Sequence, residues 1–248
     1  MSVDSAAGGR TELETVVFHA LECGSYDADV ALWLELADRA GGPVLEIGAG
    51  LGRVSRALVA AGHEVVALDT DAVLLARLAA ECDTVETVVA DARDFSLDRR
   101  FALVIAPMQT LQLLGGVRGR AGFFARVRTH LLPAGVLACA IVADVPAFAP
   151  FDGGSLPAAD IEERDGVVYV SQALALRVLP QVYELSRLRS VLAPGAPVRE
   201  YDDVVELDRV GPEALSGEGE RAGLRGLTQR KIAATDEHVA SAVVMWRG

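Results

Sequence analysis

The stretch VLEIGAGLGRVSRALVAAGHEVVALDTD, residues 44–71, decides the fold of this chain. An apolar run at 44–47 leads into the glycine-rich segment 48–52, a helical pattern follows, and a second apolar run ends at Asp69. A strand, a glycine turn, a helix and a second strand that ends on an acid are typical of a site for the ribose end of a nucleoside cofactor. This unit predicts an α/β domain that binds such a cofactor.

The alternation of strands and helices continues downstream. Strand patterns occur at 85–89, 101–106 and 136–143, and helical patterns at 71–81 and 119–130. Continuous apolar strands that alternate with helices predict a mostly parallel sheet with helices on both faces. Two further helical patterns, 12–22 and 27–40, precede the first strand.

The alternation of strand and helix patterns ends after Pro146. Three longer strand patterns at 167–176, 181–192 and 198–207 predict an antiparallel β-meander. A short helix at 211–222 and a closing strand pair at 224–233 and 239–246 follow. We predict one domain over 1–248, with a flexible tail at 1–10, a helical segment at 11–42 and a β-meander insertion at 161–207.

Composition limits the function. The 248 residues are 51% hydrophobic, carry a formal charge of -12 and include a single lysine, Lys231. This charge disfavours nucleic acid as a partner, and the absence of a long apolar run or a leader pattern predicts a cytoplasmic protein without membrane contact. The three cysteines and four histidines form no metal-ligand spacing, so we expect no metal.

The glycine pattern discriminates between cofactors. A dinucleotide fingerprint would place its third glycine at position 53, where this chain has Arg53. The pattern here is instead Glu46-x-Gly48-x-Gly50-x-Gly52. A wider glycine turn beside carboxylates suits a cofactor that carries an amino acid and a sulfonium rather than phosphates.

At this point the chain resembles the class I S-adenosylmethionine-dependent methyltransferases. The resemblance rests on EIGAGLG at 46–52, on Asp69, on Asp91 in VVADARDF, and on FALVIAPMQTLQLL at 101–114. It covers roughly residues 28–143. It implies a Rossmann-like, seven-stranded sheet with a reversed C-terminal hairpin, S-adenosylmethionine as the cofactor, and segment 11–42 as a lid.

The resemblance also implies roles for single residues. Asp69 would accept from both ribose hydroxyls, Asp91 with the Ala92 amide would contact the adenine, and Glu46 would reach the methionine amine. The full set of implied cofactor residues is Tyr26, Glu46, Gly48, Ala49, Gly50, Gly52, Asp69, Thr70, Asp91, Ala92, Ala106, Pro107 and Met108. Three alternatives stay open. Asp69 can instead cap the following helix, Asp91 can start a loop, and Arg53 can lie on the first helical turn rather than touch the methionine carboxylate.

Substrate residues are predicted from position. Because ligands lie at the carboxyl ends of parallel strands, Gln109, Thr110 and Gln112 should rim the pocket, together with Asp144. His238 lies in the turn at 235–238, which the resemblance brings to the same edge. Its position makes His238 the candidate for a general acid or base. Alternatively, its side chain simply faces solvent from the turn. Tyr26 can likewise contact ligand or simply pack.

These features predict an enzyme that transfers a methyl group from S-adenosylmethionine to an oxygen, nitrogen or carbon atom of a small metabolite by in-line displacement. Ala106-Pro107-Met108 lacks the Asp/Asn-Pro-Pro-aromatic pattern of nucleobase and glutamine methyltransferases. A non-methylating reaction such as cyclisation on the same fold is the alternative, followed by an NAD-dependent oxidoreductase. The composition is typical of a GC-rich bacterial gene, and the insertion can roof the site or join two subunits as a homodimer.

Overall fold

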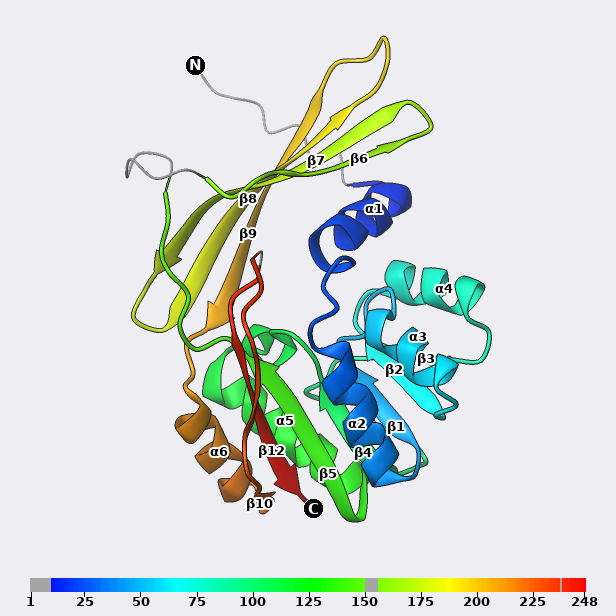
Figure 1. Cartoon of the computed structure of the whole chain (residues 1–248), viewed down its shortest axis with the longest axis vertical. Coiled ribbons are helices and arrows are strands. Elements are labelled where there is room, and N and C mark those ends of the chain that lie inside the picture. Colours follow the sequence, from blue (N-terminus) through cyan, green and yellow to red (C-terminus); the bar gives the residue numbers. More distant parts are fainter. Residues whose placement is uncertain (1–9, 150–155, 237) are drawn as a thin grey trace.

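The computed structural model describes residues 10–149, 156–236 and 238–248. It consists of an α/β layer and a separate antiparallel sheet above it (Figure 1). Apart from Arg10, the predicted tail lies outside the described residues, and so does Glu237 of the turn that holds His238.

The central sheet has the strand order β10-β12-β5-β4-β1-β2-β3, and β11 also pairs with β12. Strands β1 to β5 are parallel, whereas β12 runs antiparallel to β5. The predicted Rossmann-like, mostly parallel sheet with a reversed C-terminal hairpin is thereby confirmed. The strands are β1 Val44–Ile47, β2 Val65–Asp69, β3 Glu86–Val89, β4 Phe101–Ala106, β5 Leu131–Ile141, β10 Arg225–Gly226, β11 Arg230–Ile232 and β12 Ser241–Arg247.

The sheet has eight strands rather than the expected seven. The strand pattern at 224–233 forms two short strands, β10 and β11. Between them, the Leu227 amide still donates to the Met245 carbonyl at 2.9 Å, but the Leu227 side chain packs against the apolar cluster beneath α2. The regular ladder is interrupted at that point, although both pieces follow the path expected for one strand.

Helices cover both faces of the sheet, as predicted. Leu45 and Ile47 of β1 belong to the apolar cluster that contains Phe124 of α5, whereas Val44 packs in the cluster that contains Trp33 of α2. This alternation reflects the two-residue period of a strand buried on both faces. Within the described residues, no helix is long and apolar enough to cross a membrane. The helices are α1 Glu12–Cys23, α2 Val30–Ala40, α3 Arg53–Ala60, α4 Ala72–Glu81, α5 Gly116–His130 and α6 Pro212–Arg221, with a short 3-10 helix at Thr110–Leu113.

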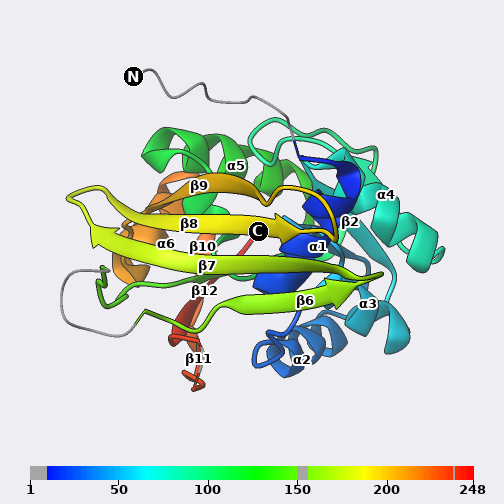
Figure 2. The ribbon, with the colours of Figure 1, turned by 90° about the horizontal axis from the view of Figure 1, so that it is seen from above.

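The second sheet, which we call the roof sheet, comprises β6 Asp160–Arg164, β7 Val167–Val178, β8 Val182–Leu192 and β9 Arg199–Asp208 in antiparallel order. It lies between β5 and α6 in the sequence and across the top of the α/β layer (Figure 2). The expected meander had three strands. The fourth, β6, has the sequence DIEER, and this charged edge strand contains a single β-branched residue, Ile161, and no aromatic residue to mark it as a strand.

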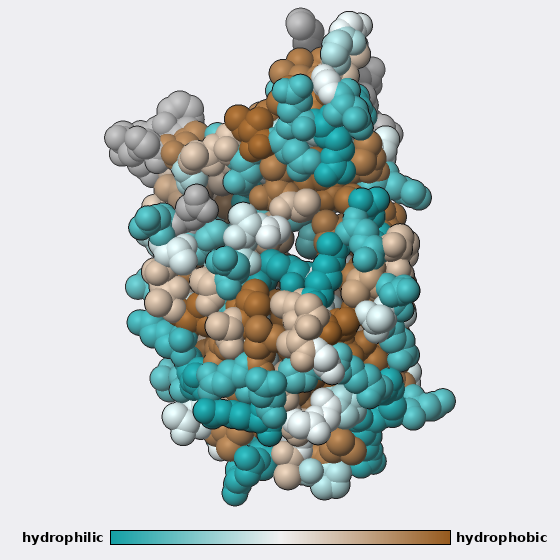
Figure 3. Space-filling model, turned by 45° about the vertical axis from the view of Figure 1, so that its right-hand side comes forward, coloured by the Kyte–Doolittle hydropathy of each residue, from teal (hydrophilic) through white to brown (hydrophobic). Residues whose placement is uncertain are grey.

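Helix α1 is attached to the roof sheet. Val17 and Phe18 of α1 pack against Tyr169 of β7. Arg189 of β8 donates two hydrogen bonds to Glu22 of α1, at 2.6 and 2.7 Å. A hollow with hydrophilic residues separates the roof sheet from the α/β layer (Figure 3). The roof sheet and α1 therefore form one wall of a cleft, and the carboxyl ends of the parallel strands form the other.

A buried ion-pair cluster joins the end of the roof sheet to the α/β layer. Arg120 of α5, which is only 3% exposed, donates to Asp208 at 2.6 Å and to both carboxylate oxygens of Glu218 at 2.7 and 2.8 Å. Removing the cation leaves two nearly buried carboxylates without their partner.

We expect Arg120→Ala to lower the free energy of unfolding by about 3–5 kcal/mol, because a buried charge without its partner is costly. Urea unfolding measures this value. Arg126→Ala is the control, since its pair with the exposed Asp94 is worth about 1 kcal/mol or less. Equal losses in the two variants would contradict the prediction.

Candidate active site

The glycine turn between β1 and α3 has an unusual backbone. Gly48, Gly50 and Gly52 have φ angles of +74°, +52° and +75°, which side chains rarely adopt. A Cβ on Gly50 would also lie 2.2 Å from the ring of His19, and one on Gly48 would lie 2.5 Å from Thr110. The turn is therefore a bare stretch of backbone that other parts of the chain approach closely. Ala49, between the first two glycines, is buried.

The carboxylate of Asp69 is fixed beside this turn. Its Oδ2 accepts a hydrogen bond from the Gly50 amide at 2.8 Å, and its Oδ1 accepts one from the Asp71 amide at 2.9 Å. The N-cap of α4 is Asp71, which accepts from the amides of Val73 and Leu74. Asp69 is therefore not the helix cap that we considered as its alternative role, and Thr70 beside it is exposed.

Glu46 is almost fully buried in β1. Ser55 of α3 donates a short hydrogen bond to its carboxylate. Burial raises the pKa of Glu46 to about 7, although the Ser55 hydrogen bond and the nearby Arg53 act in the opposite direction. A carboxyl group that gains and loses its proton near neutral pH thus lies directly below the glycine turn.

This shift gives a pH prediction for stability. Between the ordinary value of 4.5 and about 7, the unfolded chain has released the Glu46 proton while the folded chain retains it. Stability contributed by this group is therefore lost as the pH rises through that range. We expect Glu46→Gln to flatten the decline in urea-unfolding free energy between pH 4.5 and 7. A variant with the wild-type slope would contradict the shift.

Arg53 has a partner that the sequence alone did not reveal. Its guanidinium donates two hydrogen bonds to the fully buried Asp29, at 2.6 and 2.9 Å, and Trp33 donates a third to the same carboxylate at 2.8 Å. The guanidinium also lies 5.1 Å from the centre of the Tyr26 ring. The Asp29–Arg53 pair therefore fixes the segment between α1 and α2 against the start of α3.

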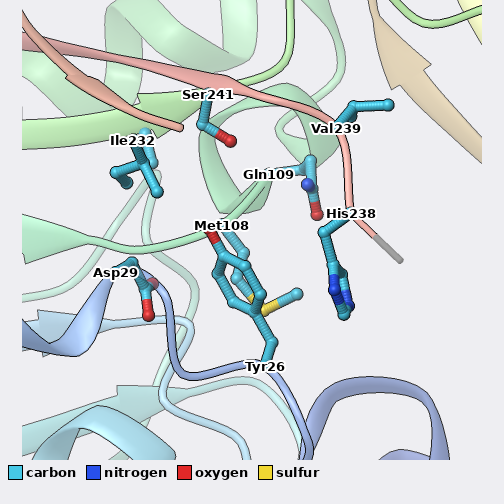
Figure 4. A pocket seen from close by; sticks show the side chains of 9 residues that line it. Tyr26, Asp29, Met108, Gln109, Ile232, His238, Val239 and Ser241 are labelled. Atoms are coloured by element: carbon cyan, nitrogen blue, oxygen red, sulfur yellow. The ribbon is translucent and has the colours of Figure 1, made fainter. Parts of the chain in front are cut away.

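A pocket at the carboxyl end of β4 contains several of the predicted residues. Tyr26, Met108, Gln109 and His238 line it, together with Ser241 of β12 (Figure 4). The rings of Tyr26 and His238 lie 4.7 Å apart between centres. The residues come from the segment before α2, the end of β4 and the C-terminal hairpin, so only the tertiary fold brings them together. Its remaining lining residues are Asp29, Ala140, Ile232 and Val239.

Two backbone features shape this pocket. Met108 has a φ of +53°, a conformation that is unfavourable for a residue with a side chain and that tends to cluster at functional sites. His238 is fixed by its turn, because its amide donates to the Thr235 hydroxyl at 3.0 Å and its carbonyl accepts from the Thr235 amide at 2.9 Å.

Other predicted cofactor residues lie at the neighbouring strand ends. Asp91 follows β3, but Arg93 donates to its carboxylate through both backbone and guanidinium, with Nη2 at 2.5 Å. This pairing lowers the pKa of Asp91. Asp91 thus forms the loop start that we considered as its alternative role, although about a third of its side chain is exposed. Ala92, Ala106 and Pro107 are buried beside it and at the end of β4.

Three residues that we predicted to rim the pocket, Gln112, Asp144 and Thr110, do not line it. Gln112 is fully buried, donates to the carbonyls of Val142 and Asp208 and accepts from the Val142 amide, so its side chain holds β5 to the end of the roof sheet. Asp144 is exposed and does not line the pocket. Thr110 donates to the Pro107 carbonyl at 2.9 Å and packs near Gly48. We therefore leave Gln112 and Asp144 out of the substrate site proposed below.

Sequence reasoning missed His19 and Asp29. His19 of α1 packs on Gly50, and its buried Nδ1 has no hydrogen-bond partner among the described residues. Its helical spacing gave no sign of this contact. For Asp29, the signal was an acid in an apolar helical segment that also contains Trp33, but a helix-start residue explains that pattern equally well.

Comparison with known proteins relates part of this chain to methyltransferases. Residues 44–135 match the model of the methyltransferase domain family. No curated protein sequence matches the chain. Among solved structures, the chain is similar to three methyltransferases. The first is CalS10, an amino pentose methyltransferase from Micromonospora echinaspora, with 20% sequence identity over 93% of this chain and 96% of that chain and a TM-score of 0.69. The second is the sugar N-methyltransferase KedS8 from Streptoalloteichus sp., with 17% identity over 100% of this chain and 96% of that chain and a TM-score of 0.74. The third is the glycopeptide N-methyltransferase MtfA with bound S-adenosylmethionine, with 25% identity over 88% of this chain and 86% of that chain and a TM-score of 0.57.

The strand order and the glycine turn are those of Rossmann-like enzymes, a class that binds nucleoside cofactors at the carboxyl ends of its parallel strands. The methyltransferase-domain match over residues 44–135 and the similarity to S-adenosylmethionine-dependent methyltransferases support a class I S-adenosylmethionine-dependent methyltransferase, with S-adenosylmethionine as the cofactor.

The residues present suit this cofactor. The turn offers bare backbone at Gly48 and Gly50, and the half-buried Asp69 carboxylate lies directly beside it. A ribose presents two hydroxyl donors, which a carboxylate with two acceptor oxygens can receive. The buried acid Glu46 and the unpartnered His19 nitrogen add polar groups near the same turn.

Proposed function

We propose that this enzyme methylates the amino nitrogen of a small, sugar-like metabolite. The observation that carries the proposal is the pocket formed by Tyr26, Met108 and His238 at the end of β4 (Figure 4). It lies at the strand edge that also carries the glycine turn. An amino acceptor is supported by the similarity to the N-methyltransferases KedS8 and MtfA, and a sugar by the similarity to CalS10 and KedS8.

The proposed cofactor residues follow the strand ends. Asp69 would accept from the ribose hydroxyls, Glu46 would interact with the methionine amine, and the backbone at Gly48 and Gly50 would let the cofactor approach. Ala92 and Asp91 would lie by the adenine, with Asp91 retaining its Arg93 partner. When bound, the cofactor supplies an electrophilic methyl group on a sulfonium, ready for in-line displacement.

The chain contributes alignment and proton removal. Holding the acceptor in line while excluding water can contribute roughly 7–11 kcal/mol to lowering the barrier. An ammonium acceptor must also lose a proton before it becomes a nucleophile. His238 is the proposed base, because its ring lies in the pocket and its backbone is fixed by Thr235. Tyr26 packs against that ring and would position it.

The experiment offers matched pairs of amino sugars and the corresponding hydroxyl sugars to the purified enzyme with S-adenosylmethionine. Mass spectrometry then detects the gain of one methyl group. Methylated amines with unmodified hydroxyl partners would support the proposal. Methylation of the hydroxyl sugars alone would overturn the choice of nitrogen, and a rearranged product without added mass would favour the cyclisation alternative.

A further inference from the structure

A second pocket lies outside the candidate active site and is lined by residues of α1, α3 and α4. These three helices are neighbours in the fold (Figure 1). The volume of the pocket is about 250 Å³. Leu51 of the glycine turn and Arg53, the first residue of α3, form one side. His19 of α1 forms another, and its ring also lies against Gly50. The pocket therefore adjoins the glycine turn.

The charge of this pocket is opposite to that of the protein. The chain carries a formal charge of -12, yet four arginines and one carboxylate, Glu81, line the pocket. Two of these arginines already have separate acids, because Arg53 pairs with Asp29 and Arg164 pairs with Glu162 at 2.7 Å.

The other two arginines share a single acid. Arg56 of α3 and Arg77 of α4 both pair with Glu81, the latter at 2.5 Å. Two guanidinium groups thus face one carboxylate. One positive charge in this part of the pocket has no counterpart among the described residues.

Unpartnered buried atoms gather at the same place. Among the described residues, three buried side-chain nitrogen or oxygen atoms have no hydrogen-bond partner. Two of them, His19 Nδ1 and Arg56 Nε, belong to residues that line this pocket. Buried polar atoms are nearly always satisfied in native proteins, so such a pair indicates an absent partner.

We propose that this pocket binds an oxyanion of phosphate or carboxylate size, held by Arg56 and Arg77 with His19 beside it. Planar guanidinium groups present several donors in a geometry that matches such anions. An anion there would supply the missing charge and an acceptor for Arg56 Nε. The anion has two possible sources: the carboxylate of the cofactor's methionine part, or the phosphate group of a separate ligand.

Calorimetric titration with inorganic phosphate tests the site. Wild-type protein is expected to bind phosphate, and Arg56→Gln and Arg77→Gln should each weaken this binding about tenfold, since a charged hydrogen bond is lost. The matched control is Arg39→Gln, an exposed α2 arginine that also pairs with a glutamate, and it should bind as wild type does. Arg56→Lys keeps the charge without Nε and is expected to fall between wild type and Arg56→Gln.

A second titration distinguishes the two sources. If the anion is the cofactor's carboxylate, phosphate competes with S-adenosylmethionine, and Arg56→Gln weakens binding of S-adenosylmethionine but not of its decarboxylated analogue. If the anion belongs to a separate ligand, phosphate binds the free protein and the cofactor complex equally well. Absence of phosphate binding, together with unchanged cofactor affinity in Arg56→Gln, would overturn the proposal and leave a pocket that holds only water.

Discussion

Replacing Asp69 by alanine is expected to weaken S-adenosylmethionine binding by about 100-fold or more, as measured by calorimetric titration. The reason is that the proposed ribose contacts are hydrogen bonds to a charged acceptor, each worth about 1.5–3 kcal/mol. Asp69 also accepts from the Gly50 amide, so its removal loosens the turn on which the cofactor would lie. Both effects reduce affinity in the same direction.

Two further variants separate these effects. Asp69→Asn keeps an oxygen acceptor for the Gly50 amide but loses the charge, so its affinity should lie between those of wild type and Asp69→Ala. Asp94→Ala removes an exposed carboxylate that pairs with Arg126, and it should leave binding unchanged. If Asp69→Ala bound the cofactor as tightly as the Asp94 control, the proposed ribose site would be wrong.

The second large effect is expected at His238. If its imidazole removes the proton from the acceptor amine, His238→Ala should lower kcat by about 10²- to 10⁴-fold. S-adenosylmethionine affinity should stay close to the wild-type value, because the proposed cofactor contacts lie elsewhere. Single-turnover kinetics with the amino substrate measures the loss at the chemical step.

A structural role for His238 makes a different prediction. His238 packs on Tyr26, and its removal could simply disturb that ring. Added imidazole should restore part of the activity of His238→Ala if a base is missing, but not if packing is lost. Tyr26→Phe, which retains the ring and removes only the hydroxyl, should keep most of the activity. A kcat near wild type in His238→Ala would end the proposal of a histidine base.

Several elements were predictable because their signals are local. The unit at 44–71 folds as expected, since the apolar period of β1 and β2, the glycines and the N-cap Asp71 each act over a few residues. Strand β4 was predicted to the residue. The strand β6 was missed for the same reason, because an edge strand with charged residues has no strong local signal.

The site was predictable only in part. The family resemblance predicted that His238 lies at the edge formed by the strand ends, and the structure places it in the pocket with Met108. Gln112 follows the same strand, but its side chain turns inward to the backbone of Val142 and Asp208. Position along a strand therefore predicts the neighbourhood of a residue, whereas the direction of its side chain depends on which distant groups need a partner.

The sequence by itself determined the fold class, because hydrophobic period and turn chemistry are properties of short segments. The resemblance of its motifs to a known family predicted the cofactor and the strand edge proposed to bind it. Only the tertiary structure decided that Arg53 pairs with Asp29, that His19 packs on Gly50, and that Arg56 shares Glu81 with another arginine. These contacts join residues about 24 to 31 positions apart. They depend on how helices pack over the sheet, and the cost of leaving buried charges unpaired then selects the partners.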